Sequence, residues 1–206
     1  MNVAVIRECP LFTKMIDRLE PITAEYASAL KSTGIGAVGR YLENLTPGER
    51  DSIFSAGLGI LPLSEAAVRP LSEEFGKSKA EFLLQRTALL GVPTGAHVMI
   101  DLEGQHGTNS DIAAYDEAIS DGLASGGYIP LAYIGAGQVL SGAALYALPD
   151  VHLYWRGGSL GIPEPSCGFA MWQIPPLEQP VANSIVDVSI TGADLRGRKP
   201  ILWWPS

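Results

Sequence analysis

Short apolar runs alternate along the chain with longer amphipathic segments, and this alternation predicts a parallel β-sheet covered by helices. The apolar runs predict eight strands, because most runs are bounded by glycine, proline or polar residues. These strands cover residues 12–16, 37–42, 58–63, 96–103, 129–134, 151–155, 169–174 and 185–190. The segments between them predict helices over residues 26–30, 46–56, 78–90, 109–124 and 138–146.

Capping residues mark several of the predicted helix ends. Thr46, Pro47 and Glu49 have the spacing of an N-cap, a first helical residue and a capping-box glutamate. Gly57 and Gly91 stand where glycine commonly ends a helix. These signals place one helix between the second and third strands and another before the fourth strand.

Eight strands interleaved with helices predict a single (β/α)8 barrel of the TIM type over residues 1–206. The later units are expected to be shortened, because the glycine- and proline-rich connections between the sixth and eighth strands leave little room for full helices. A doubly wound open sheet is the competing architecture, and it usually carries a glycine-rich phosphate loop after its first strand. Here the first strand is followed by Asp17-Arg18-Leu19-Glu20-Pro21, which favours the barrel.

The charge of the chain changes the range of expected partners. Its 206 residues carry a formal net charge of −8, so neither nucleic acid nor an anionic membrane surface is expected to bind. A neutral polymer such as a glycan fits this charge, and the oligomeric state is left open. No apolar run is long enough to span a membrane, and the first residues lack the pattern of a signal peptide. We therefore expect a protein made in the cytoplasm.

Motifs for metal, cofactor or nucleophilic chemistry are missing from the sequence. Cys9 and Cys167 have no metal-binding spacing and are expected to be buried free thiols, although the sequence leaves their pairing open. The three histidines are not spaced as metal ligands, and no phosphate loop, dinucleotide fingerprint or nucleophile elbow is present. We expect neither a cofactor nor a metal.

The stretch Ala96–Gly104 is the strongest chemical signal in the chain. Its apolar run ends in Asp101 and Glu103, which are spaced i, i+2 and therefore face the same side of a strand. Neighbouring carboxylates do not both ionise easily, so the pKa of one of them is expected to be raised. A proton donor beside an anion is what glycoside hydrolysis requires. The alternative is a strand end with two solvated acids.

In a barrel, functional side chains gather at the C-terminal ends of the strands. Each polar or aromatic residue there also has a structural interpretation, as a loop acid, an ion-pair partner or a core aromatic. Asp187 in particular needs a partner if it is buried, either Arg40 or a sugar hydroxyl. The candidates at these ends are Asp17, Arg40, Glu65, Asp101, Glu103, Tyr133, Trp155, Gln173 and Asp187.

These residues form part of a longer series of short motifs that extends over nearly the whole chain. The series comprises Ile16-Asp17, Val38-Gly39-Arg40-Tyr41-Leu42, Leu45-Thr46 with Glu49, Ala56-Gly57-Leu58, Leu90-Gly91-Val92-Pro93, Asp101-Leu102-Glu103, Tyr133-Ile134-Gly135, Tyr154-Trp155, Trp172-Gln173 and Val186-Asp187. It resembles the glycoside hydrolase-like domain of unknown function that occurs in actinobacterial secreted proteins and in phage and prophage proteins. That domain is similar in turn to the family 25 glycoside hydrolases, the lysozyme-like muramidases.

The resemblance implies a hydrolase of the endolysin type that acts on peptidoglycan. Glu103 would be the general acid, Asp101 its partner and Asp17 the acid that faces them across the barrel. One departure concerns the first strand, which has Met15-Ile16 before Asp17 where the family usually has Gly-Phe.

The remaining candidates would contact the sugar. Tyr133 and Trp155 would flank it, and Gln173 and Asp187 would form hydrogen bonds to it. Arg40 and Glu65 are the other two expected substrate-binding residues. Without a signal peptide, such a lysin would depend on a holin or on delivery within a phage particle. A barrel that binds glycan without cleaving it, or that serves as a structural part of a virion, is the alternative function.

Overall fold

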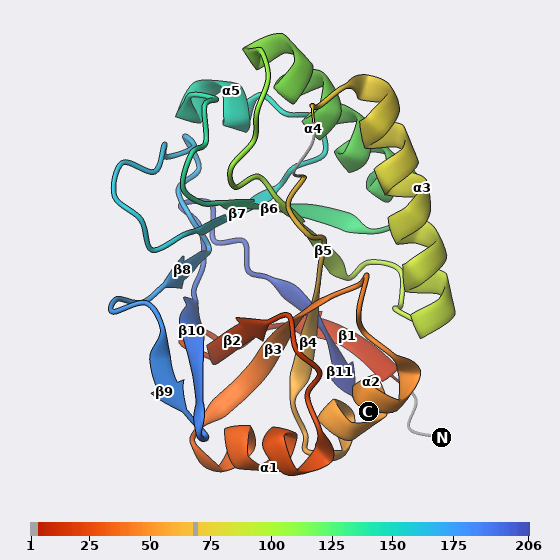
Figure 1. Cartoon of the computed structure of the whole chain (residues 1–206), viewed down its shortest axis with the longest axis vertical. Helices are drawn as coiled ribbons and strands as arrows, with labels where there is room; N and C mark the ends of the chain where they lie inside the picture. Colours follow the sequence, from red (N-terminus) through yellow and green to blue (C-terminus); the bar gives the residue numbers. More distant parts are fainter. Residues whose placement is uncertain (1–3, 68–69) are drawn as a thin grey trace.

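Eight strands close into a barrel in the computed structural model, which describes residues 4–67 and 70–206 (Figure 1). Neighbouring strands pair in parallel from β2 to β8, and β10 pairs with both ends of this series. The predicted barrel is therefore confirmed. Its strands are β2 (Lys14–Arg18), β3 (Ile35–Tyr41), β4 (Gly59–Leu63), β5 (His97–Asp101), β6 (Ile129–Ile134), β7 (Leu153–Arg156), β8 (Met171–Gln173) and β10 (Ser184–Thr191).

The last barrel strand runs against the others, which is the main departure from a uniform (β/α)8 pattern. β10 is antiparallel to both β8 and β2. The segment 174–183 that precedes it holds only the short strand β9 (Gln179–Val181), which forms a hairpin with β10. A parallel crossover needs a dozen or more residues, so this short segment returns the chain in the opposite direction.

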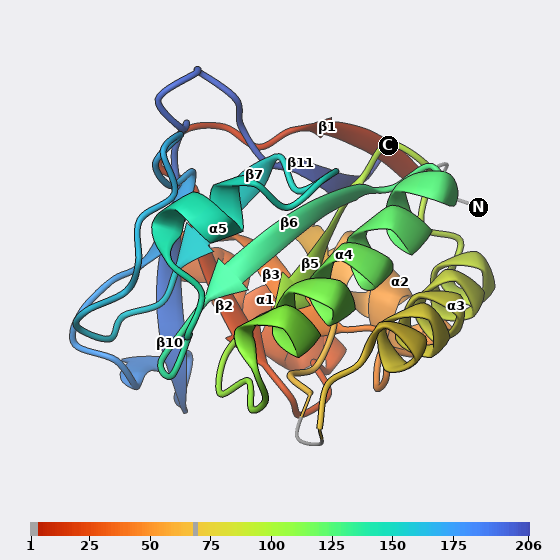
Figure 2. The ribbon, with the colours of Figure 1, turned by 90° about the horizontal axis from the view of Figure 1, so that it is seen from above.

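Five helices of the described residues lie on the outside of the barrel (Figure 1, Figure 2). Each begins after a serine or threonine whose side-chain oxygen accepts a hydrogen bond from a backbone N–H in the first turn, as N-caps do. The third helix starts five residues earlier than predicted, at Glu73 rather than Ser78. The helices are α1 (Ala24–Ser32), α2 (Pro47–Ser55), α3 (Glu73–Leu90), α4 (Asn109–Ser125) and α5 (Gly142–Tyr146).

Two strands that the apolar pattern did not predict lie at the N-terminal end of the barrel. β1 (Ala4–Glu8) and β11 (Ile201–Pro205) pair antiparallel, and β11 also pairs with β4 through Trp203 and Ile60. Leu202 and Trp204 of β11 pack with the side chains inside the barrel. A Cβ atom on Gly59 would lie 2.9 Å from the ring of Trp204, so only glycine fits there. β11 therefore closes this end, and the opposite end carries the site.

Both cysteines are buried and free, as expected. Cys9 packs with the side chains inside the barrel, whereas Cys167 belongs to the core between the sheet and the helices. Among the described residues, no helix combines the length and the apolar character that a membrane span requires.

Candidate active site

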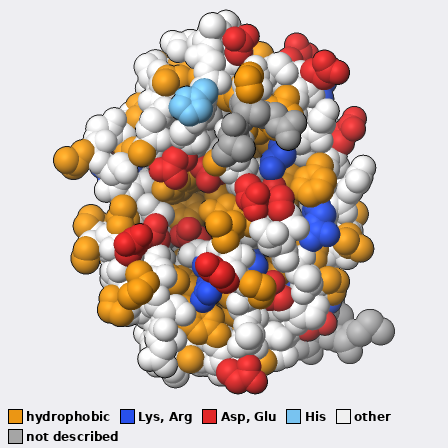
Figure 3. Space-filling model, in the orientation of Figure 1, with side chains coloured by type: hydrophobic (Ala, Val, Ile, Leu, Met, Phe, Trp, Pro, Cys, Tyr) orange, Lys and Arg blue, Asp and Glu red, His pale blue; other side chains and the backbone are white. Residues whose placement is uncertain are grey.

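A cavity of about 160 Å³ opens at the C-terminal end of the barrel strands. Acidic side chains gather near the centre of the face shown in Figure 3. Within residues 4–67 and 70–206, the charged side chains that line the cavity are all carboxyl groups. The lining residues are Asp17, Tyr41, Met99, Asp101, Glu103, Tyr133, Trp155, Gln173 and Asp187.

Asp17 lies directly opposite Asp187, because β2 and β10 pair in the register that aligns these two residues. Side chains directly opposite on antiparallel strands are close neighbours. The pKa of Asp17 is raised to about 7, mainly by burial and also by the charges of Asp187, Asp101 and Glu103. One carboxyl oxygen of Asp17, Oδ1, is buried without a hydrogen-bond partner. Asp17 therefore holds a proton easily and has an oxygen available for a ligand.

Asp101 ends β5, and its carboxyl oxygen Oδ1 accepts a hydrogen bond of 2.9 Å from the backbone N–H of Glu103. The pKa of Asp101 is raised to about 7, mainly by burial and to a smaller extent by the neighbouring charge of Glu103. The sequence predicted a raised pKa from repulsion between these two acids. The structure confirms the direction and shows that burial is the larger cause.

Glu103 is less enclosed than Asp101, and its carboxylate is held from the loop after β6. Its Oε1 atom accepts a hydrogen bond of 2.9 Å from the backbone N–H of Ala136. The backbone N–H of Gly104 donates in return to the carbonyl oxygen of Ala136, also at 2.9 Å. A Cβ atom on Gly135 would lie 2.7 Å from the Glu103 carboxyl group, so glycine makes room for it. These contacts fix Glu103 at the mouth of the barrel.

Gln173 connects two walls of the cavity. Its Oε1 atom accepts hydrogen bonds from the hydroxyl of Tyr133 at 3.1 Å and from the backbone N–H of Gly158 at 2.9 Å. Its Nε2 atom donates to Asp187 at 3.4 Å, and Asp187 also accepts from the backbone N–H of Glu178 at 2.8 Å. The network orients the amide of Gln173 and the carboxylate of Asp187.

The aromatic residues form one wall of the cavity. Tyr133 and Trp155 pack edge to face, with ring centroids 5.1 Å apart. Trp155 is only 1% exposed, and its Nε1–H group is buried without a hydrogen-bond partner. Burial raises the pKa values of Tyr41 and Tyr133, so both hydroxyls stay neutral. The wall thus offers hydrogen-bond donors for a bound ligand.

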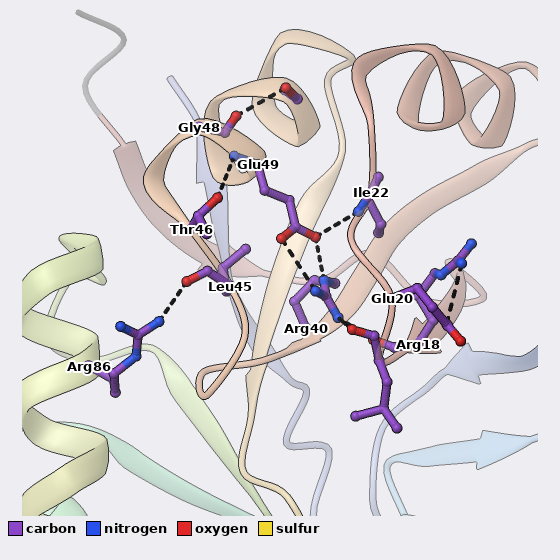
Figure 4. A network of polar contacts seen from close by, with 11 residues as sticks. Arg18, Glu20, Ile22, Arg40, Leu45, Thr46, Gly48, Glu49 and Arg86 are labelled. Carbon is purple, nitrogen blue, oxygen red and sulfur yellow. Dashed lines mark hydrogen bonds and ion pairs between the residues drawn. The ribbon is translucent and has the colours of Figure 1, made fainter.

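Arg40 lies outside the cavity, in a buried ion pair with Glu49 of α2 (Figure 4). Its side chain is fully buried, and its Nε atom lies 2.6 Å from Oε1 of Glu49. It also donates to the backbone carbonyls of Arg18 and Leu19. The position of Arg40 corrects the expectation that it binds substrate and matches its alternative role as an ion-pair partner. It also leaves Asp187 without the pairing to Arg40 that the sequence left open.

Glu65 also lies outside the cavity. It follows β4 and accepts a hydrogen bond of 2.8 Å from the side chain of Asn44. Its charge contributes to the raised pKa of Tyr41, so it lies near the rim. The structure does not bring it into contact with the other candidates.

Tyr41 and Met99 line the cavity although they were not predicted as site residues. Alternation along the strands could have revealed both, because Met99 shares a face with Asp101. By the same rule Tyr41 faces the barrel interior with Gly39, and the intervening Arg40 faces the helices. Within residues 4–67 and 70–206, no group of histidine, cysteine or acidic side chains is arranged to hold a metal ion.

A closed α/β barrel with carboxyl groups gathered at the C-terminal ends of its strands is an architecture that glycoside hydrolases share with other barrel enzymes. The family model described as "Rv2525c-like, glycoside hydrolase-like domain" matches residues 28–174. The chain belongs to this family, which confirms the resemblance predicted from its motifs. No curated protein sequence matches the chain significantly.

Solved structures share the fold at low sequence identity. The Tat-secreted protein Rv2525c of Mycobacterium tuberculosis, in complex with L-tartrate, aligns with a TM-score of 0.67 and 15% identity, over 87% of this chain and 95% of that one. The lysozyme of Streptomyces coelicolor aligns with a TM-score of 0.60 and 12% identity, over 87% and 92% of the two chains. The modular autolysin LytC of Streptococcus pneumoniae, in complex with a synthetic peptidoglycan ligand, aligns with a TM-score of 0.58 and 15% identity, over 93% of this chain and 46% of that one.

Proposed function

We propose that this protein is a glycosidase that hydrolyses bacterial cell-wall peptidoglycan. The observation that carries the proposal is the cluster of four carboxyl groups in one cavity, two of which have pKa values of about 7. Such a cluster holds protons and negative charge together at neutral pH, as acid-catalysed glycoside hydrolysis requires. Membership of the glycoside hydrolase-like family and the fold shared with a lysozyme support the same function.

Glu103 is the proton donor in this proposal. It is the acid that follows β5 at the mouth of the barrel, and the Ala136 N–H fixes its carboxyl group. A substrate oxygen can therefore reach it more easily than it can reach the buried Asp101. The carboxyl group of Asp101 accepts a hydrogen bond from the backbone N–H of Glu103, which ties Asp101 to the backbone of the proton donor.

Asp17 and Asp101, which pKa values of about 7 leave partly ionised at neutral pH, would in their ionised form stabilise the positive charge that develops on the sugar in the transition state. They would act either directly or by orienting the N-acetyl group of the substrate. Trp155 supplies an N–H donor beside them, the Tyr133 hydroxyl oxygen can accept, and Gln173 with Asp187 would bind sugar hydroxyls.

A barrel that binds glycan without cleaving it remains the alternative function. Carboxylates that were neutralised by arginine or lysine would favour it, because they could then not hold a catalytic proton. Among the residues that the structure describes, no lysine or arginine lines the cavity, and Arg40 is paired with Glu49 instead. These two observations favour the hydrolase.

The proposal is tested by incubating the wild-type protein with purified peptidoglycan and identifying the new reducing ends by mass spectrometry. Reducing N-acetylmuramic acid or N-acetylglucosamine ends would support a glycosidase and name the bond that is cleaved. Intact glycan strands that nevertheless co-sediment with the folded protein would refute hydrolysis and support the binding alternative.

A further inference from the structure

A second group of buried polar side chains lies behind the carboxyl cluster, and the mechanism above does not use it. Asp116 of α4 is 1% exposed, and Gln105 of the loop after β5 is 2% exposed. The Nε2 atom of Gln105 donates a hydrogen bond of 2.7 Å to Oδ1 of Asp116. Burial raises the pKa of Asp116 to about 7, so this acid is readily protonated. Replacing a buried polar pair by an apolar pair is often neutral or stabilising, so stability alone does not explain a polar pair at this position.

The pair is connected to a second loop. Gln138, which lies in the loop after β6, donates through Nε2 to Oε1 of Gln105 and to the backbone carbonyl of Leu102, at 3.3 Å each. The Oε1 atom of Gln138 accepts a hydrogen bond of 2.7 Å from the backbone N–H of Leu140. Both the nitrogen and the oxygen of the Gln138 amide are therefore hydrogen-bonded. The amide joins the loop after β5 to the loop after β6.

These two loops are the ones that hold Glu103. Leu102, whose carbonyl receives Gln138, precedes Glu103 in the chain, and Ala136, whose N–H binds the Glu103 carboxylate, lies two residues before Gln138. α4 packs against both β5 and β6, and it supplies the fixed end of the connection (Figure 2). The chain of contacts therefore runs from a helix of the scaffold to the backbone on both sides of Glu103.

We propose that Asp116, Gln105 and Gln138 form a clip that positions Glu103 for proton donation. The three are positioning residues, because they touch Glu103 only through the loop backbone. This inference rests on the proposed function for its kinetic consequence, but the clip itself has a structural readout that does not need activity. A small displacement of a catalytic group costs up to about a hundredfold in rate, so loss of the clip is expected to lower kcat roughly ten- to a hundredfold.

The experiment compares Gln105→Leu and Asp116→Leu with Asp116→Asn. The leucine variants remove the hydrogen bond between α4 and the loop, whereas asparagine keeps an oxygen that accepts from Gln105 and mimics the protonated acid. Ser120→Ala is the matched control, because Ser120 is also fully buried on α4, and its hydroxyl bonds only to backbone carbonyls of the helix.

Two readouts are measured on each variant. The first is amide hydrogen exchange at Gly104 and Ala136, with Ile129 at the other end of β6 as a reference for global opening. The second is kcat and KM for reducing-end release from soluble peptidoglycan oligosaccharides. The clip predicts exchange about tenfold faster at Gly104 and Ala136 in the leucine variants and unchanged at Ile129, together with a lower kcat at similar KM. Asp116→Asn and Ser120→Ala are expected to behave as the wild type.

Unchanged exchange at Gly104 and Ala136, or an equal rise at Ile129, would overturn the clip and leave the pair a structural role only. Wild-type kcat in the leucine variants, with exchange accelerated locally, would also overturn it as a positioning device. A wild-type protein without any activity would refute the proposed function instead, and the exchange at Gly104 and Ala136 would still decide whether the clip exists.

Discussion

Asp17 and Asp101 are acids whose pKa values are raised to about 7 mainly by burial at the open end of the barrel. The sequence indicated the pairing of Asp101 with Glu103, because spacing alone places both on one face. It could not indicate the depth of burial, nor the register that brings Asp187 opposite Asp17, since both depend on contacts between distant segments. The position of Arg40, by contrast, could have been predicted from the sequence. Alternation of side chains along β3 places Arg40 on the face that points away from the cavity.

The raised pKa of Asp17 predicts how stability depends on pH. A folded-state pKa of about 7, against 3.8 for the exposed group, gives stability that is fully present below about pH 4 and is lost as the pH rises through 7. Asp17→Asn removes this loss, so we expect its free energy of unfolding at about pH 8 to exceed that of the wild type by roughly 1–3 kcal/mol, with a smaller gain at about pH 5. Urea unfolding at both pH values measures this. The same difference at both would contradict a raised pKa in the folded state.

The buried ion pair between Arg40 and Glu49 predicts that a single substitution of Glu49 strongly destabilises the protein. Glu49→Gln leaves the Arg40 guanidinium buried without a charge partner, so we expect a loss of about 3–5 kcal/mol in the free energy of unfolding. Glu73→Gln breaks an exposed pair with Lys77 and serves as the control, with a much smaller expected loss, because exposed ion pairs contribute little to stability. Denaturant unfolding compares the two. Similar small losses would show that the buried pair is solvated after all.

The elements differ in how far the chain predicts them. Hydrophobic runs and N-cap residues predicted the helices and seven parallel strands, because these signals are local. β1 and β11 were missed, since β11 is defined by its pairing with β1 and β4 rather than by a periodic pattern of its own. The direction of β10 could not be predicted either, because side chains alternate with the same period in parallel and antiparallel strands. Only the short segment before it, which leaves no room for a crossover helix, carries that information.

The contact between α3 and α4 predicts a difference between two glycines. A Cβ atom on Gly76 would lie 2.6 Å from the backbone carbonyl oxygen of Tyr115, whereas one on Gly48 meets nothing within 4 Å. Gly76→Ala is therefore expected to destabilise the protein by about 1–3 kcal/mol despite the better helix propensity of alanine. Gly48→Ala, also in a helix, should be neutral or stabilising by up to about 1 kcal/mol. Thermal unfolding checks both, and a stable Gly76→Ala protein would mean that the helices separate without cost.

The whole molecule is a barrel that is closed at one end and chemically active, in our proposal, at the other. β11 fills the N-terminal end with Leu202 and Trp204, and the carboxyl cluster occupies the C-terminal end. The family and the fold could both be predicted from the sequence, because the short motifs mark the ends of the strands. The orientation of each side chain at the open end of the barrel could not be predicted, because it depends on closure of the barrel by β10.

The measurement that tests the central claim most directly is reducing-end release from purified peptidoglycan by the wild type, Glu103→Gln and Glu65→Gln. Both variants neutralise an acid that follows a barrel strand, but only Glu103 lines the cavity. We expect Glu103→Gln to lose at least about a hundredfold in rate while keeping its fold, because general acid catalysis contributes about that much or more. Glu65→Gln should retain nearly full activity. Equal rates in all three proteins would contradict the assignment of Glu103 as the proton donor and, with it, the mechanism.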